Sequence, residues 1–414
     1  MMAAKSSAWQ RLPIVGLCEV HVDCVNRTAP VVAEPTPFKM LRTTNVRNGY
    51  IDVTNVRYVT EETYKKWTRR LVPKRGDIIL TREAPLGGVG KIRTDDAVFL
   101  GQRLYHFRPD PKKLDADFLL YSLLADDLQS QIRGYGSGST VEHMRLEDIP
   151  FLEFNVPPLP VQQRIAGILS AYDELIENSQ RRIKILESMA RALYREWFVH
   201  FRFPGHESVP RVASALGEIP QGWEVKKLGE IAEEMRRNVP KGRLQEPRPF
   251  VGLEHIPRKS LALDAWEATT ELGSNKLEFK KGEVLFGKIR PYFHKVSVAP
   301  FDGLCSADTI VIRARRPEHY AWVVACVSSD AFVAEASATA NGAKMPRANW
   351  DVLKQYAVIV PKGGVADRFS ALTSDVIEQQ HKFVFQIQNL RRTRDLLLPR
   401  LLSGQIDVEA LADA

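Results

Sequence analysis

The sequence predicts an α+β protein in which two tandem-duplicated mixed α/β domains are separated by two long helices forming an antiparallel coiled coil. Two observations lead to this prediction. The chain of 414 residues matches itself at an offset of about 204 residues, and each half ends in a long stretch with helical apolar periodicity. The expected parts are a mixed domain over residues 1–158, a central helical spacer over 159–217, a second mixed domain over 218–361 and a C-terminal helical spacer over 362–414.

Composition places the chain among ordinary folded proteins. Hydrophobic residues make up 44% and charged residues 26%, which provides enough apolar material for cores. Four cysteines are too few for a disulfide scaffold, so a reducing cytoplasm is expected. No run approaches the roughly 18 apolar residues that span a bilayer, and no signal peptide is visible, so no membrane partner is expected. The net charge of +8 is a weak indication of a polyanionic partner.

The internal repeat rests on an ordered series of matches. A basic turn with a glycine, an acid and an apolar run occurs at 74–80 and again at 280–286. The loop 136–140 matches 340–344, and Val156-Pro157 recurs 204 residues later as Val360-Pro361. Such a series at a nearly constant offset indicates a tandem duplication, and two copies favour a pseudo-two-fold molecule.

The stretch 159–201 predicts the first long helix. Apolar or small residues recur from Val161 to Trp197 with a mean spacing of 3.6, and Pro157-Pro158 precedes the stretch. The second copy keeps this register, with Phe369 and Leu390 lying 204 residues after Ile165 and Leu186. Each apolar stripe is too long for one small domain to cover, so we expect the helices to pair antiparallel. The alternative is that each helix lies on its own domain.

Three short motifs resemble functional signatures and fail on inspection. Residues 85–91 resemble a phosphate-binding loop, but Ile92 stands where Ser or Thr must bind magnesium, so a glycine-rich turn between two strands is expected. Residues 155–159 resemble the base-pocket motif of amino-methyltransferases, but Val156 is inserted and no aromatic residue follows. Cys18, His21 and Cys24 do not share one face of a strand, so no metal site is expected. With no catalytic constellation, a binding function is favoured over an enzymatic one.

The duplication and two helical phrases together resemble the specificity subunit of a type I restriction-modification enzyme. The phrases are Pro-Pro-Leu-Pro-x-Gln-Gln-Arg-Ile-Ala at 157–166 and Leu-Leu-Pro-Arg-Leu-Leu-Ser-Gly-Gln-Ile at 397–406. The match covers nearly the whole chain. It departs from the family at 363–368, where the second helix begins without the Gln-Gln pair of the first.

The resemblance implies what this chain binds. It implies two target recognition domains that read the halves of a bipartite, asymmetric site in double-stranded DNA, and paired helices that fix the gap between the halves. It also implies two docked methyltransferase subunits that carry adenine-N6 methylation and S-adenosylmethionine, and it leaves open whether restriction translocase subunits join. The chain itself would be non-catalytic, with no cofactor of its own.

Candidate DNA contacts are polar residues in loops that both copies place similarly. Arg and Lys pair well with guanine, and Asn and Gln pair well with adenine. In the first copy the candidates are Arg82, Glu83, Gln102, Arg103, Ser137, Ser139, Thr140 and His143; in the second they are Lys288, Arg290, Tyr292, His294, Lys295, Asn341, Lys344 and Arg347. For each residue the simpler interpretation is a solvated loop side chain.

Two other functions compete with DNA specificity. A DNA methyltransferase or nuclease with its own active site would need a cofactor loop and a base-pocket motif. A protein scaffold would use the helices only to join two modules, and its complex would show no sequence-selective footprint on DNA.

Overall fold

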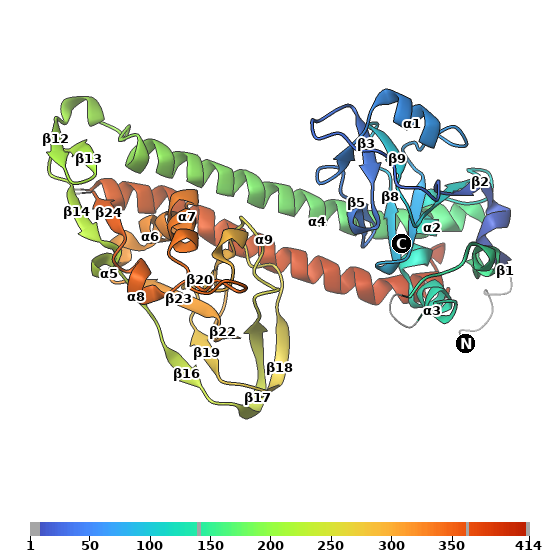
Figure 1. Cartoon of the computed structure of the whole chain (residues 1–414). Coiled ribbons are helices and arrows are strands. Elements are labelled where there is room, and N and C mark those ends of the chain that lie inside the picture. The colour runs from blue at the N-terminus through green and yellow to red at the C-terminus, as the bar shows by residue number, and fades with distance from the viewer. Residues whose placement is uncertain (1–8, 139–141, 362–363, 411–414) are drawn as a thin grey trace. The chain divides into compact units, whose positions relative to one another are not determined.

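The computed structural model describes residues 9–138, 142–361 and 364–410. The chain divides into two compact units, one of Met1–Glu174 with Arg391–Ala414 and the other of Leu175–Leu390. We call these unit 1 and unit 2. The division cuts through the two long helices, α4 (Leu159–Tyr194) and α9 (Val365–Leu402), so each unit holds one mixed domain and a part of each helix (Figure 1).

Unit 1 is built on a four-stranded antiparallel sheet in the order β2-β10-β7-β8. A three-stranded sheet, β6-β3-β9, contains the parallel pair β3 and β9, and β1 pairs with β11. The strands are β1 (Gln10–Pro13), β2 (Cys18–Asp23), β3 (Phe38–Leu41), β4 (Val46–Arg47), β5 (Tyr50–Ile51), β6 (Arg57–Tyr58), β7 (Ile78–Arg82), β8 (Leu86–Lys91), β9 (Ala97–Leu100), β10 (Leu104–Pro109) and β11 (Glu153–Val156). The helices are α1 (Glu61–Trp67), α2 (Ala116–Leu124) and α3 (Asp126–Gly134).

The expected glycine-rich turn at 85–91 is wrong, because most of this segment is strand β8. Its glycines allow the β4–β5 hairpin to approach the strand closely. A Cβ atom on Gly88 would lie 2.9 Å from the carbonyl oxygen of Val46, and one on Gly90 would lie 2.7 Å from that of Tyr50. The glycines therefore serve backbone packing and do not form a loop.

Unit 2 repeats this plan with a larger second sheet. Its four-stranded antiparallel sheet has the order β15-β23-β20-β21, and its five-stranded sheet, β16-β19-β22-β17-β18, contains the parallel pair β17 and β22. The strands are β12 (Arg211–Ser214), β13 (Gly217–Pro220), β14 (Glu224–Lys227), β15 (Ala232–Glu234), β16 (Arg237–Val239), β17 (Gly242–Val251), β18 (Glu267–Leu272), β19 (Lys276–Phe279), β20 (Val284–Gly287), β21 (Val296–Val298), β22 (Gly303–Ser306), β23 (Thr309–Ala314) and β24 (Ala357–Val360). The helices are α5 (Leu228–Ile231), α6 (Tyr320–Val327), α7 (Asp330–Ala338) and α8 (Trp350–Leu353).

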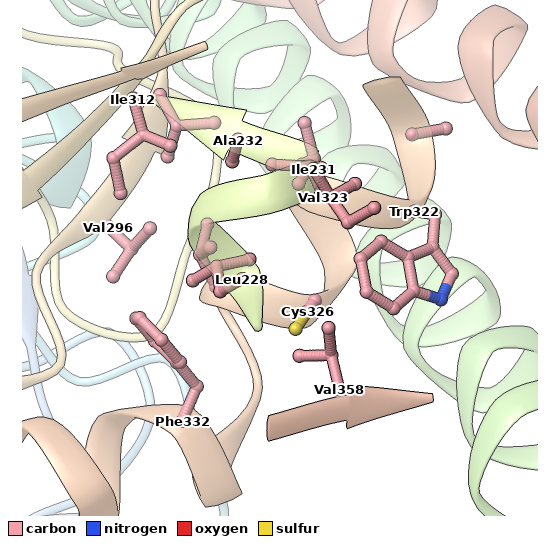
Figure 2. Packing of buried hydrophobic residues seen from close by; sticks show 14 of the residues in the cluster. Leu228, Ile231, Ala232, Val296, Ile312, Trp322, Val323, Cys326, Phe332 and Val358 are labelled. Atoms are coloured by element: carbon pink, nitrogen blue, oxygen red, sulfur yellow. The ribbon is translucent and has the colours of Figure 1, made fainter. Parts of the chain in front are cut away.

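The core of unit 2 gathers apolar side chains from most of these elements. Figure 2 shows Trp322 and Cys326 of α6 beside Leu228 of α5, Phe332 of α7 and Val358 of β24. All five side chains are buried. The apolar character of α6, which has no charged residue, follows from this central position.

Each mixed domain contains the same internal backbone hydrogen bond at the equivalent place. The amide of Ile14 donates to the carbonyl of Leu152 at 3.0 Å, and the amide of Leu228 donates to that of Tyr356 at 2.9 Å. In both contacts the residue that follows the first strand is joined to the residue just before the last strand. Each domain therefore begins and ends at one paired strand end.

In unit 2 the segments of α4 and α9 run in opposite directions. Tyr194 of α4 contacts Phe369 of α9, with ring centroids 6.3 Å apart, whereas Arg182, earlier in α4, lies over Phe383, later in α9. In unit 1 the beginning of α4 shares a buried core with the end of α9, through Ile165 and Leu401. Each unit therefore buries an apolar seam between the two helices.

Within the described ranges, no single helix is long and apolar enough to cross a bilayer, although the bent pair Pro317–Val327 and Asp330–Ala338 passes that test by length and composition together.

Candidate nucleic-acid interface

In unit 1 the end of β7 meets the loop after α3. Isolated β-bridges join His143 to both Glu83 and Ser137, and the amide of Met144 donates to the carbonyl of Arg82 at 2.9 Å. The backbone therefore holds three segments together: the strand end at 82–83, the loop at 137 and the segment at 143–144.

Unit 2 builds the same framework. Isolated β-bridges join Arg347 to both Ile289 and Asn341, and the amide of Ala348 donates to the carbonyl of Lys288 at 2.9 Å. The residue after the bridged position, Glu83 or Ile289, has a positive φ in both copies, +48° at Ala84 and +49° at Arg290. The two clusters thus share a backbone and differ in the side chains that they present.

The first cluster presents few free charges. Arg82 is only 7% exposed, and its guanidinium donates to the carbonyl of Met144 at 2.9 Å, so it holds the loop instead of facing solvent. Glu83 pairs with exposed Arg103 at 2.8 Å. Gln102 is also exposed and accepts from Thr28 at 3.4 Å.

The remaining candidates of the first copy lie in the loop after α3. Ser137 is exposed and His143 is half-buried. Ser139 and Thr140 lie outside the described residues.

The second cluster is more basic and more aromatic. The guanidinium of Arg258 lies 4.0 Å from the ring centroid of Phe293, and that of Arg290 lies 6.0 Å from it. Tyr292 beside them is 56% exposed. Arg347 is exposed and pairs with Asp308 at 3.4 Å. Exposed cations and an exposed ring are the groups that contact phosphates and bases.

The solvent exposure of the other candidates of the second copy ranges from exposed to buried. Asn341 and Lys344 are exposed, whereas Lys288 is half-buried and donates to the carbonyl of Ala307 at 3.1 Å. His294 is buried and contacts the carbonyl of Ser328 at 2.9 Å, and burial lowers its pKa.

Lys295 is half-buried and donates to the carbonyl of Leu253. Burial, and then the charge of Arg258, lower the pKa of Lys295. His294 and Lys295 therefore support the loop from within.

The sequence reasoning missed Arg258 and Phe293. Arg258 comes from a loop of another part of the domain, and its isolated bridge to Lys295 brings it to the cluster. Phe293 adjoins the candidates Tyr292 and His294, so the aromatic pair Tyr292-Phe293 in a basic segment was the available signal.

The Cys18, His21 and Cys24 motif has a structural role in unit 1. Nδ1 of His21 lies 2.8 Å from the hydroxyl of Tyr105, and the thiol of Cys18 donates to the carbonyl of Ile14 at 3.4 Å. Among the residues that the structure describes, no group of three His, Cys, Asp or Glu side chains is arranged to hold a metal ion.

Comparison with known proteins decides the family. Residues 9–188 match the family model described as the type I restriction modification DNA specificity domain. The chain belongs to the specificity subunits of type I restriction-modification systems. The matched region covers the first recognition domain and most of α4.

Individual relatives agree over longer stretches. The chain is 26% identical over 364 residues to the MjaIX specificity subunit of Methanocaldococcus jannaschii, covering 86% of this chain and 83% of that one. It is 25% identical to the EcoDI specificity subunit of Escherichia coli over 70% of this chain and 65% of that one. The crystal structure of a type I restriction-modification S subunit from M. genitalium shares the fold, with a TM-score of 0.56, 17% identity and coverage of 95% of this chain and 96% of that one.

Proposed function

We propose that this specificity subunit reads a bipartite, asymmetric DNA site through two target recognition domains, 1–158 and 218–361. Each domain reads one half-site with its loop cluster, and the helical spacers, 159–217 and 362–414, set the gap between the halves. The spacers do so as an antiparallel coiled coil. The subunit is non-catalytic and works in the cytoplasm.

The observation that carries this proposal is the loop framework that occurs in both domains with the same backbone bridges. The bridges at His143 and Arg347 hold equivalent loops, yet one residue is a histidine and the other an arginine. A conserved backbone with different side chains is what two readers of unequal half-sites require, since base-edge contacts specify the sequence. We assign Arg82, His294 and Lys295 to loop support and retain the other candidates as DNA contacts.

We further propose that the helices dock two methyltransferase subunits, which bring S-adenosylmethionine and methylate adenine at N6, and that restriction translocase subunits join through them. Exposed apolar side chains on the helix segments of unit 2 support this docking. Ile185 is 52% exposed and Met189 is 60% exposed, one helical turn apart on α4, and Leu372 on α9 is 55% exposed. Such side chains are typical of surfaces that a partner covers.

Mapping of methylated adenines tests the proposal. The chain is expressed with its methyltransferase subunits, and methylation is mapped at single-base resolution. We expect a split motif with a fixed gap.

Arg347→Ala should relax one base position in one half only, with a discrimination loss of about 1–3 kcal/mol, because a base contact is lost. Unchanged specificity for both Arg347→Ala and Arg290→Ala would contradict the assignment of the second cluster.

A further inference from the structure

A basic cleft lies on α4 in unit 2, beside the second recognition cluster. Its volume is about 710 Å³, and it is lined by α4 from Gln180 onward, by Arg195 directly after that helix, by the loop 257–264 and by Asp330 of α7. Five of its side chains are basic, namely Lys184, Arg191, Arg195, Arg258 and Lys259, whereas three are acidic, namely Glu187, Asp264 and Asp330.

Three basic residues share one face of α4 and of the π-helical turn Arg195–Val199 that continues it. Lys184, Arg191 and Arg195 are spaced by seven and four residues, and this spacing returns to the same side of an α-helix. All three are exposed. The face is therefore a stripe of cations about three turns long.

A buried carboxylate fixes the loop against this stripe. Glu187 is 4% exposed and accepts from the hydroxyl of Ser260 and the amide of Leu261, each at 2.7 Å. Arg191 donates to Glu187 at 3.2 Å and to the carbonyl of Lys259 at 2.5 Å. Since the charge of Glu187 is used internally, it does not neutralise Lys184, Arg195 or Lys259 at the surface.

The stripe continues into the recognition cluster. The amide of Lys259 donates to the carbonyl of His294 at 2.9 Å, and Arg258 next to it lies over Phe293. Arg290 lies over the same ring. One band of cations, all exposed except half-buried Arg290, thus runs from the loop cluster to the spacer helix within unit 2.

We infer that this band, through Lys184, Arg195 and Lys259, binds the phosphate backbone of the DNA duplex beside the half-site read by the second domain. The inference rests on the proposed function and adds a contact between DNA and the spacer helix. Phosphate contacts supply affinity and position without reading sequence. The second long helix lacks this stripe, because the positions 204 residues later in α9 are Gln388, Asp395 and Pro399. The backbone contact is therefore expected at one half-site only.

The test compares two triple variants of the full chain in complex with its methyltransferase subunits. The band variant replaces the three cations of the band, Lys184→Gln/Arg195→Gln/Lys259→Gln. The control variant removes the same amount of charge elsewhere in unit 2, Arg182→Gln/Lys226→Gln/Lys382→Gln. Binding to a duplex with the mapped motif and to one without it is measured from about 0.05 to 0.3 M salt. Each phosphate contact contributes about fivefold at roughly 0.15 M salt, so we expect about a hundredfold weaker binding to both duplexes for the band variant.

The salt dependence and the methylation motif separate the outcomes. The band variant should lower the slope of log affinity against log salt by about 2 to 3, leave the motif unchanged and expose the backbone beside one half-site to hydroxyl-radical cleavage. An unchanged slope, or an equal loss in the control variant, overturns the inference. Loss of the methyltransferase subunits with an unchanged slope overturns it too, and makes the band a protein contact. If no duplex is bound selectively by the unaltered complex, the proposed function fails instead.

Discussion

The two units join their helix segments by different chemistry at equivalent positions. In unit 1, Asp173 of α4 pairs with Arg394 of α9 at 2.5 Å, and the hydroxyl of Tyr121 donates to the same carboxylate at 2.7 Å. The positions related by 204 residues in unit 2 are Ile377 of α9 and Ala190 of α4, which line one mainly apolar cavity of about 240 Å³. A buried ion pair in one copy thus corresponds to two apolar side chains in the other.

The difference shows which properties the duplication preserved. Backbone geometry recurs, as at Gly76 and Gly282, whose φ angles are +96° and +86°. Side-chain chemistry has diverged both in the helix seam and in the loop clusters. Divergence in the seam makes the two halves distinguishable, and divergence in the loops is what unequal half-sites require.

The largest expected effect comes from breaking the buried ion pair between the helix segments of unit 1. Arg394→Ala leaves the Asp173 carboxylate, which is 5% exposed, without its cation. Removing one partner of a buried ion pair costs about 3–5 kcal/mol, because an uncompensated charge remains buried. Urea unfolding of the chain measures the loss.

A transplant of the apolar seam provides the control. Asp173→Ile combined with Arg394→Ala reproduces the pair of unit 2, and Tyr121→Phe removes the hydroxyl that would lose its acceptor. An apolar replacement of a buried ion pair is often neutral, so this triple variant should recover at least half of the loss. A triple variant no more stable than Arg394→Ala would show that the two seams are not interchangeable.

A smaller effect concerns pH and the turn before β7. Burial alone would raise the pKa of Asp77, but the hydrogen bonds from Arg108 and the imidazole of His106, whose Nε2 lies 2.6 Å from the carboxylate, lower it to about 2. A carboxyl group whose pKa is lower in the folded than in the unfolded state stabilises the fold at any pH above its unfolded-state pKa. This stabilisation is lost as the pH falls toward the folded-state pKa. We expect about 2 kcal/mol to disappear between about pH 4 and pH 2.

Acid unfolding of Asp77→Asn checks this expectation. The variant should be less stable at neutral pH and lose less further stability on acidification than the unaltered chain. Asp95→Asn is the control, because its pair with Arg75 lies at the surface. Parallel acid-unfolding curves for the unaltered chain and Asp77→Asn would exclude Asp77 as the responsible group.

The smallest expected effect tests whether the two turns are truly alike. Gly76→Ala and Gly282→Ala should each cost about 1–2 kcal/mol, because an L-residue is strained at positive φ, and no atom crowds the added methyl group closer than 3.6 Å. Gly134→Ala, at the end of α3, is the control and should cost less. Clearly unequal losses at Gly76 and Gly282 would argue that the turns have diverged as well.

The sequence predicted the long helices well because their signal is local and repeated. The periodic stretch from Val161 onward becomes α4, and the stretch from Phe369 onward lies in α9. The error at 85–91 has a physical reason. Glycines normally indicate turns, and only the neighbouring hairpin explains why Gly88 and Gly90 belong to a strand.

Sequence reasoning could propose candidate loops but could not say which of their side chains face outward. Arg82 and Arg103 look equivalent in the sequence, yet Arg82 is buried against Met144 whereas Arg103 is exposed. Contacts between distant segments, such as Arg258 with Phe293, depend on the folded sheet and leave no local pattern.

One measurement tests most directly the claim that each copy reads its own half-site. In a chimeric chain, a second copy of residues 14–152 replaces residues 228–356. The two junctions lie at the paired strands β14 and β24, which correspond to β1 and β11 of the first domain. Methylated adenines are then mapped in cells that express this chain with its methyltransferase subunits. We predict a motif whose two halves are now the same and inversely repeated, with a fixed gap between them. A motif identical to that of the unaltered chain, or an undivided one, would contradict the account.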